Sequence, residues 1–236
     1  MTAADDPDGI GDLNAVNSWT RDDVHRSIEE SLKRLNMDSV EIIYVHDPDV
    51  EAYGEEQALN EAFPALIELR EQGVIKAIGC GMNIWDMPLK FIQRFDLDII
   101  LLAGRYTLLD HSGLDEFLPV CVESDVKITI GGPYNSGILA RDLSKPVTFN
   151  YEQAPGHLVE QARKLTEICV SHGIDLKAAA LQFVLAHPAV ATAVPGAQST
   201  AELEQNIAMV QQDIPSAVWS DMRSAGLIPD NAPTPD

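Results

Sequence analysis

The stretch that decides the fold is SVEIIYVHDPDV, residues 39–50. Residues 42–45 are β-branched or aromatic and show no polar alternation, which is typical of a strand buried on both faces. His46, Asp47 and Asp49 follow at once. A histidine in that place is either a catalytic group at the mouth of a strand or a polar residue that enters a loop, and these residues alone leave both interpretations open.

Composition limits the class of protein. The chain has 236 residues, of which 45% are hydrophobic, enough for one domain with a substantial core. Its formal net charge of -21 would repel nucleic-acid phosphates and anionic membrane surfaces, so we expect neither as a partner. No apolar run approaches the roughly 20 residues of a membrane helix. Residues 1–17 lack the basic and apolar blocks of a signal peptide, and we therefore expect a soluble, cytoplasmic protein.

The cysteines favour neither a disulfide framework nor a metal site. Cys80, Cys121 and Cys169 are odd in number and lack CxxC or other metal-type spacing. This usage is typical of a reducing compartment. We expect no metal cofactor.

Strand-like and helical stretches alternate along the chain. Val24, Ile28, Leu32 and Leu35 recur three or four residues apart and predict an amphipathic helix that Ser18 or Thr20 could cap. The predicted strands lie at residues 40–45, 74–81, 97–104, 126–132 and 190–196. The predicted helices lie at residues 18–36, 55–73, 85–95, 114–124, 158–173, 175–187, 200–210 and 215–226.

The connections between these strands are too long for hairpins, so we expect parallel strands joined by helical crossovers. No composition break marks a second domain. The prediction is therefore one partial barrel domain over residues 1–236, with residues 1–17 as the remnant of a loop and residues 227–236 as a tail. The irregular stretch 138–156 has the length of a functional or mobile loop.

Two architectures share this alternation, a doubly wound sheet and a (β/α)8 barrel. GCGMNIW, residues 79–85, carries only the first half of the G-x-G-x-x-G pattern that a dinucleotide-binding sheet requires. A barrel instead brings polar and glycine residues together from the ends of several strands. Such residues follow all five predicted strands: His46 and Asp47, Gly81 and Asn83, Arg105 and Tyr106, Asn135 and Ser136, and Gly196 and Gln198. The barrel is therefore the prediction.

Four segments resemble the aldo-keto reductases, in order and at fitting distances, between about Ser18 and Gly226. They are SIEESLKRLNMDSVEIIYVHDPD, LLAGRYTLL, GGPYNSGIL and VPGAQSTAELEQN. Within that family, the sequence resembles the branch of D-threo-aldose or L-fucose 1-dehydrogenases and pyridoxal 4-dehydrogenases. The resemblance implies an α/β fold, an incomplete (β/α)8 TIM barrel made of roughly the last five strand–helix units. It also implies an oxidoreductase that transfers a hydride between a nicotinamide cofactor and an aldose or a small aldehyde or alcohol.

The resemblance makes His46 one of four catalytic residues, where an imidazole can hydrogen-bond a substrate carbonyl or hydroxyl. The aspartate, tyrosine and lysine that accompany it in the family have no matching positions, because Tyr44, Tyr106 and Tyr134 lie on other strands. We therefore expect an N-terminally truncated chain, with exposed strand edges that favour self-association. The alternative function is an inactive remnant or a partner-binding fragment.

The resemblance also implies a cofactor that lies extended across the barrel mouth. Asn83 would approach the nicotinamide carboxamide, although it could equally cap the next helix. Tyr106 would line the pocket or would simply pack. Asn135, Ser136 and Gly137 follow a strand in a loop whose N–H groups can approach a pyrophosphate.

The last of the four segments carries the adenosine end of the expected site, with Gly196, Gln198 and a helix that begins at Ser199 or Thr200 and can receive phosphate. Gly196 and Glu202 stand where NADP users of the family carry basic residues, and Glu202 would repel a 2′-phosphate. We therefore expect NAD rather than NADP, although Glu202 could also be an ordinary exposed helix residue. Gln205 and Asn206 match positions that hydrogen-bond the adenine.

Overall fold

The computed structural model describes residues 17–235. Five parallel strands form one sheet in the order in which they occur in the chain. A doubly wound sheet reverses its strand order at a switch point, whereas a barrel never does. The prediction of a barrel-type α/β fold is therefore confirmed, and over residues 17–235 the sheet does not close into a ring. The strands are β1 (Ile42–His46), β2 (Ala77–Met82), β3 (Ile99–Ala103), β4 (Lys127–Gly131) and β7 (Val190–Val194).

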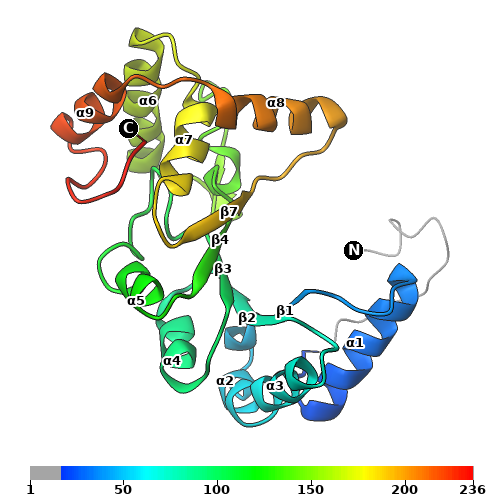
Figure 1. Cartoon of the computed structure of the whole chain (residues 1–236). Helices are drawn as coiled ribbons and strands as arrows, with labels where there is room; N and C mark the ends of the chain where they lie inside the picture. The colour runs from blue at the N-terminus through cyan, green and yellow to red at the C-terminus, as the bar shows by residue number, and fades with distance from the viewer. Residues whose placement is uncertain (1–16, 236) are drawn as a thin grey trace.

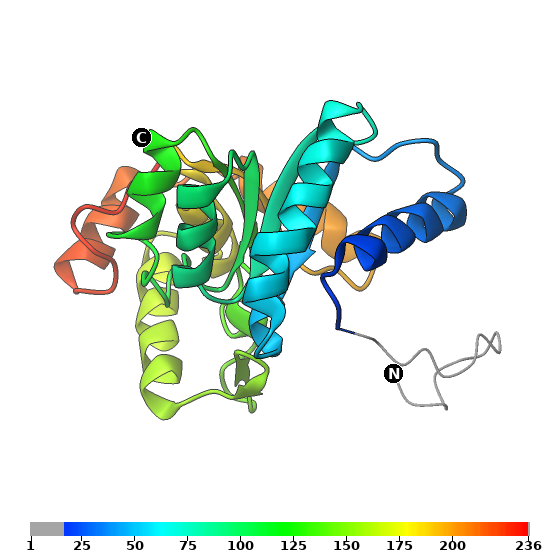
Figure 2. The ribbon, with the colours of Figure 1, turned by 90° about the horizontal axis from the view of Figure 1, so that it is seen from below.

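The strands follow a curve, and α3, α4, α5 and α7 lie along its convex side (Figure 1). Figure 2 shows α5, α4 and α3 side by side in front of the sheet, and α1 (blue) lies next to α3 at the end of this row. One layer of crossover helices on the outside is the arrangement of a barrel wall. The helices are α1 (Arg21–Leu35), α2 (Gly54–Gln57), α3 (Phe63–Glu71), α4 (Asp86–Arg94), α5 (Phe117–Glu123), α6 (Gly156–Ser171), α7 (Leu176–Leu185), α8 (Thr200–Gln211) and α9 (Ser216–Ser224).

The core lies between the strands and these outer helices. Ile100 and Leu102 point to that side from β3 and are fully buried. Phe63 at the start of α3 is also fully buried, and its ring centroid lies 4.9 Å from that of Phe91 on α4, in an edge-on arrangement. The ring centroid of Phe95 also lies 4.9 Å from that of Phe63. These aromatic contacts hold two neighbouring crossover helices against the sheet.

The inner face of the sheet carries small residues near the carboxyl ends of the strands. A Cβ atom on Gly131 would lie 3.2 Å from the Cβ atom of Ala103 on the neighbouring strand. Farther in, the Tyr44 hydroxyl lies 3.4 Å from Oγ1 of Thr129, although β2 and β3 separate their strands. Tyr44 and Thr129 therefore fill the inner face at mid-height and leave its carboxyl-terminal edge open.

Local signals placed several helix ends correctly. Thr20 caps α1, since its side chain accepts a hydrogen bond from the N–H of Asp23, and Ser199 caps α8. Gly73 follows α3 with a φ of 75°, a left-handed conformation that glycine adopts without strain. The predicted strands and helices are thus present, with ends shifted by a few residues.

The helix predicted over residues 55–73 is interrupted by a π-helical turn, η3 (Ala58–Ala62). The N–H of Phe63 bonds to the carbonyl oxygen of Ala58, five residues back instead of four. Pro64 follows, and its missing N–H removes the next ordinary α-helical bond. Periodicity alone does not reveal such a turn, because the apolar face continues through it.

The stretch 138–156, expected to be an irregular loop, contains a small antiparallel hairpin of β5 (Thr148–Phe149) and β6 (Glu152–Gln153). The hairpin holds the loop after β4. Thr148 Oγ1 donates to the carbonyl oxygen of Ser136 at 3.0 Å, and the N–H of Tyr151 donates to Ser136 Oγ at 3.1 Å.

The two ends of the chain were predicted to be irregular. Of the expected loop remnant, only Asn17 belongs to the described residues. In the expected tail, Leu227, Ile228 and Ala232 are buried, and Arg223 on α9 donates to the carbonyl oxygen of Ala232. Within residues 17–235 no single helix is long and apolar enough to cross a membrane, and α6 and α7 meet that measure only as a pair bent by 101°. No group of three or more potential metal ligands occurs in the same range.

We expect Phe63→Ala to lower the free energy of unfolding by about 3–5 kcal/mol, because it removes a fully buried ring and leaves a cavity between α3 and α4. Urea denaturation followed by circular dichroism would measure the loss. Val170→Ala on α6 is the control, since Val170 is 67% exposed and its truncation should change stability by no more than about 0.5 kcal/mol. Equal losses in the two variants would contradict the described packing.

Candidate active site

The carboxyl ends of the five strands form one rim, and His46 ends the first of them. Its imidazole is 67% exposed, and Nδ1 lies 3.2 Å from Oδ2 of Asp47. The other edge of the ring lies above Gly81, where a Cβ atom would come within 3.0 Å of His46 Cδ2. The carbonyl oxygen of His46 accepts a hydrogen bond from the indole N–H of Trp19 at 3.0 Å. The imidazole therefore lies exposed at the rim, and the hydrogen bond from Trp19 holds the backbone of His46 in place.

Asp47 is held in an unusual backbone conformation. Its φ is 44°, in the left-handed region that aspartate tolerates better than most residues. Its N–H donates to the carbonyl oxygen of Gly81 at 2.9 Å, which continues the pairing of β1 with β2 by one residue. Burial raises the pKa of the Asp47 carboxyl above its usual value, His46 opposes this shift and Asp49 adds to it.

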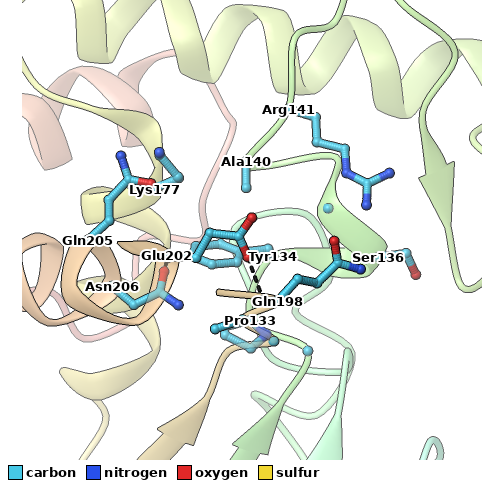
Figure 3. Close-up of a pocket in the computed structure, with 14 residues that line it drawn as sticks. Pro133, Tyr134, Ser136, Ala140, Arg141, Lys177, Gln198, Glu202, Gln205 and Asn206 are labelled. Atoms are coloured by element: carbon cyan, nitrogen blue, oxygen red, sulfur yellow. Dashed lines mark hydrogen bonds between the residues drawn. The ribbon is translucent and has the colours of Figure 1, made fainter. Parts of the chain in front are cut away.

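A pocket of about 440 Å³ lies between the loop after β4 and the start of α8, with α7 beside it (Figure 3). The structure brings seven of the predicted cofactor residues together in its lining: Ser136, Gly137, Gly196, Gln198, Glu202, Gln205 and Asn206. They come from two segments about 60 residues apart in the chain, which the pairing of β4 with β7 makes neighbours.

The first turn of α8 is capped at the pocket by Ser199, and Glu202 reaches back to the residue before this cap. Ser199 Oγ accepts the N–H of Glu202 at 3.2 Å. Glu202 Oε2 accepts the N–H of Gln198 at 2.7 Å (Figure 3). Glu202 is therefore both an exposed helix residue with a structural role and a negative charge fixed at the pocket wall. Its carboxylate also occupies one of the N–H groups that could otherwise receive an anion.

Asn206 is oriented by Tyr134. The Tyr134 hydroxyl donates to Asn206 Oδ1 at 2.9 Å, and both side chains are nearly buried. Burial, with a smaller effect of Asp175, raises the pKa of Tyr134 above its usual value, so that the hydroxyl remains a donor. The amide nitrogen of Asn206 is then left to face the pocket (Figure 3).

Two cations line the same pocket, and sequence reasoning missed both. Arg141 lies over Gly137, where a Cβ atom would come within 2.8 Å of the guanidinium Nε, so the absence of a side chain at Gly137 makes room for Arg141. Lys177, at the start of α7, has its Nζ atom 3.8 Å from Oδ2 of Asp175. The only signal in the sequence was the position of Lys177 just after a helix cap, and Arg141 lay in a stretch without periodicity.

Three residues predicted for the cofactor site, Asn83, Tyr106 and Asn135, lie outside this pocket. Tyr106 is fully buried and stacks on Phe183 at 5.2 Å, which is the packing role that the sequence left open. Asn135 is 2% exposed, and its amide nitrogen points to the carbonyl oxygen of Gly104 at 3.5 Å, away from the pocket. The backbone explains why the Asn135 side chain points away from the pocket. Asn135, Ser136 and Gly137 all have positive φ, so the chain turns sharply here and neighbouring side chains point in different directions.

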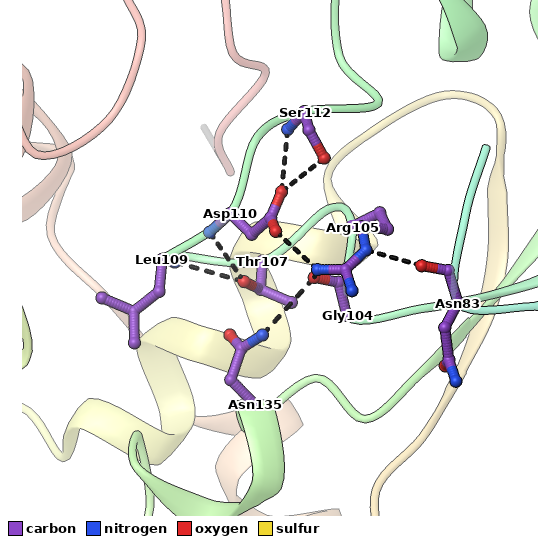
Figure 4. A network of polar contacts seen from close by, with 8 residues as sticks. All are labelled: Asn83, Gly104, Arg105, Thr107, Leu109, Asp110, Ser112 and Asn135. Atoms are coloured by element: carbon purple, nitrogen blue, oxygen red, sulfur yellow. Dashed lines mark hydrogen bonds and ion pairs between the residues drawn. The ribbon is translucent and has the colours of Figure 1, made fainter. Parts of the chain in front are cut away.

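Asn83 follows β2 on the rim and belongs to a separate polar network (Figure 4). Arg105 Nε donates to the carbonyl oxygen of Asn83 at 2.6 Å, and Arg105 NH1 pairs with Asp110 at 2.8 Å. The N-cap of α4 is Trp85, so Asn83 does not cap that helix. Its side chain is exposed and points away from the network, which leaves its amide available at the rim (Figure 4).

Comparison with known proteins places the chain in a family. The sequence profile described as "Aldo/keto reductase family" matches residues 11–226. An aldo-keto reductase from Bacillus halodurans in its holo form superposes with a TM-score of 0.73 at 22% identity, over 88% of this chain and 68% of that one. At this identity the likeness concerns the fold alone.

Two curated relatives are more similar in sequence. D-threo-aldose 1-dehydrogenase from Pseudomonas sp is 37% identical over 219 residues, which cover 92% of this chain and 66% of that protein. Pyridoxal 4-dehydrogenase from Microbacterium luteolum is 36% identical over 220 residues, 90% of this chain and 64% of that protein. The chain thus spans just under two thirds of the length of each. Profile, relatives and fold agree, and the chain belongs to the aldo/keto reductase family.

Proposed function

We propose that the chain forms the cofactor-binding part and one wall of the substrate site of an oxidoreductase. In this proposal the pocket at α8 binds the adenosine and phosphate part of a nicotinamide dinucleotide. An aldose, or another small aldehyde or alcohol, lies at the rim beside His46. The observation that carries the proposal is the pocket itself, because it joins a cation, glycine backbone and side-chain amides from two distant segments, groups suited to phosphates and to a base.

The residues present fit such a cofactor. A side chain at Gly132 or at Gly196 would meet nothing within 4 Å, so a ligand can approach the backbone of both segments closely. Arg141 belongs to the loop after β4 and lines the pocket, where it would face a pyrophosphate. Gln205 and Asn206 offer amide groups to a base on the opposite wall.

The cofactor, when bound, supplies a carbon that accepts or gives up a hydride. The chain's own residues bind and orient. Asn83 would contact the carboxamide of the nicotinamide at the rim, and His46 would hydrogen-bond the substrate oxygen. Oriented binding of this kind lowers the activation barrier by placing the reacting atoms before the reaction begins.

We propose NAD as the preferred cofactor, because Glu202 holds its negative charge at the pocket wall through its bond to Gln198. A 2′-phosphate would add close to two negative charges beside it. Lys177 would favour NADP, but Asp175 partly neutralises its charge. Arg141 lies over Gly137 on the other side of the pocket, where it suits the phosphates that both cofactors share.

The second candidate is a catalytically inactive remnant or a partner-binding fragment. It is favoured by the sheet, whose strands β1 and β7 each have one neighbour within residues 17–235. Such strand edges invite pairing with another chain. Retained cofactor binding without turnover would favour this candidate.

We expect the 236-residue chain to bind NAD+ more tightly than NADP+ in calorimetric titrations. The repulsion from Glu202 should be worth on the order of 1 kcal/mol, several-fold in affinity. Glu202→Gln keeps an acceptor for the N–H of Gln198 and removes the charge, so it should strengthen NADP+ binding several-fold and leave NAD+ binding nearly unchanged.

Glu204→Gln is the matched control, since Glu204 is exposed on the same helix outside the pocket. It should alter neither affinity, and high salt should weaken the effect of Glu202→Gln. Absence of binding of either cofactor would contradict the proposed function. Preference of the unaltered chain for NADP+ would contradict only the role of Glu202.

Arg141→Ala should weaken NAD+ and NADP+ by similar factors, about tenfold, because it removes a charge-assisted contact to phosphates present in both. Competition with ADP-ribose would report the same site without the nicotinamide. An effect confined to NADP+ would show that Arg141 reads the 2′-phosphate instead.

We further expect the isolated chain to self-associate through its strand edges, because each edge strand carries an exposed apolar side chain. Ile42 on β1 is 42% exposed and Val194 on β7 is 54% exposed. Replacing either with lysine should raise the monomer fraction in sedimentation velocity runs. Val122→Lys, at a 49% exposed site on α5, introduces the same charge away from the edges and should have no effect. A monomeric unaltered chain, or an equal effect at Val122, would contradict this expectation.

A further inference from the structure

We propose that Asp47 is a positioning residue that keeps the proton of neutral His46 on Nδ1, so that Nε2 accepts a hydrogen bond from a substrate hydroxyl. The inference deepens the proposed function and rests on it for the location of the substrate. It assigns a chemical class to the preferred ligand of His46, an alcohol or hemiacetal rather than a free carbonyl.

The pair has a fixed geometry. Asp47 Oδ2 lies 3.2 Å from Nδ1, and within residues 17–235 Asp47 is the carboxylate that pairs with His46. The position of the carboxylate follows from the backbone. The φ of 44° turns the chain at Asp47, its N–H is bound to Gly81, and its carbonyl oxygen accepts the N–H of Val50 at 3.2 Å. The Asp47 side chain is 31% exposed, less than half the exposure of the imidazole, so water competes for it only in part.

The opposite edge of the imidazole is open. Nε2 and Cδ2 lie above Gly81, where even a Cβ atom would come within 3.0 Å of the ring. A side chain at this position of β2 would therefore displace the imidazole. Because Gly81 has none and the ring is 67% exposed, Nε2 is accessible from the rim.

The carboxylate of Asp47 beside Nδ1, and the absence of a side chain at Gly81 beside Nε2, decide which tautomer of His46 is stable. A neutral imidazole carries one proton, and its partner determines which nitrogen holds it. A carboxylate 3.2 Å from Nδ1 attracts the proton to that nitrogen. Nε2 then presents a lone pair, which accepts a hydrogen bond from a hydroxyl group and repels the oxygen of a carbonyl. Neutral His46 is thus suited to the hydroxyl form of the substrate.

Long-range ¹H–¹⁵N correlation spectra of the 236-residue chain, with histidine labelled and recorded at alkaline pH, would test the tautomer directly. His46→Gln identifies the signals of His46 among those of the six histidines. The expected spectrum shows the proton on Nδ1. Asp47→Gly removes the carboxylate, and glycine tolerates the positive φ. In this variant the Nδ1–H tautomer should no longer be the more populated one, and the Nε2–H tautomer should replace it.

Asp49→Asn is the matched control, because it removes a carboxylate two residues away and should leave the tautomer unchanged. Asp47→Asn keeps the backbone conformation and a neutral acceptor, and should give an intermediate ratio. Two results would overturn the proposal. One is a proton on Nε2 of His46 in the unaltered chain, and the other is the same tautomer in Asp47→Gly as in the unaltered chain. The titration with NAD+ is independent of this result, so failure of the proposed function and failure of this inference can be told apart.

Discussion

The hydrogen-bonded register of the parallel strands is the constraint on which the rest of the molecule depends. His46 pairs with Gly81, and Ala103 pairs with Gly131, so the strands end nearly level with one another. Because every strand runs in the same direction, each crossover helix must return on the outside, and every loop after a strand emerges at the same rim. The imidazole, the polar network and the pocket at α8 lie along the same rim for this reason.

Much of this arrangement could be predicted from sequence. The period of the apolar residues revealed strands and helices, and cap residues such as Thr20 and Ser199 marked helix ends. The four family segments indicated which loops would meet, and seven of the residues taken from them line one pocket. Side-chain direction was not predictable, because it depends on distant partners. Tyr106 turns into the core to stack on Phe183 of α7, a contact that no local pattern reveals.

The features that the sequence did not reveal also depend on distant partners. Arg141 belongs to a stretch with no periodicity, and its place over Gly137 follows from a turn of three residues with positive φ. The hairpin that supports this turn is two residues long on each side, too short for a recognisable alternation. Glu202 was read as a charge that faces a cofactor, whereas the structure also gives it a capping role. In the proposed function this residue would therefore serve helix stability and cofactor discrimination together, and a substitution that preserves the cap would separate the two.

The two outer strands of the sheet have a consequence for the behaviour of the protein in solution. Edge pairing acts over a few ångströms, while the mutual repulsion of chains that each carry a net charge of -21 acts over the Debye length, about 10 Å at 0.1 M salt. At low ionic strength the charge keeps two copies apart before their edges can meet. Added salt removes this barrier and leaves the short-range attraction, so the colloidal stability of the isolated chain should fall as ionic strength rises.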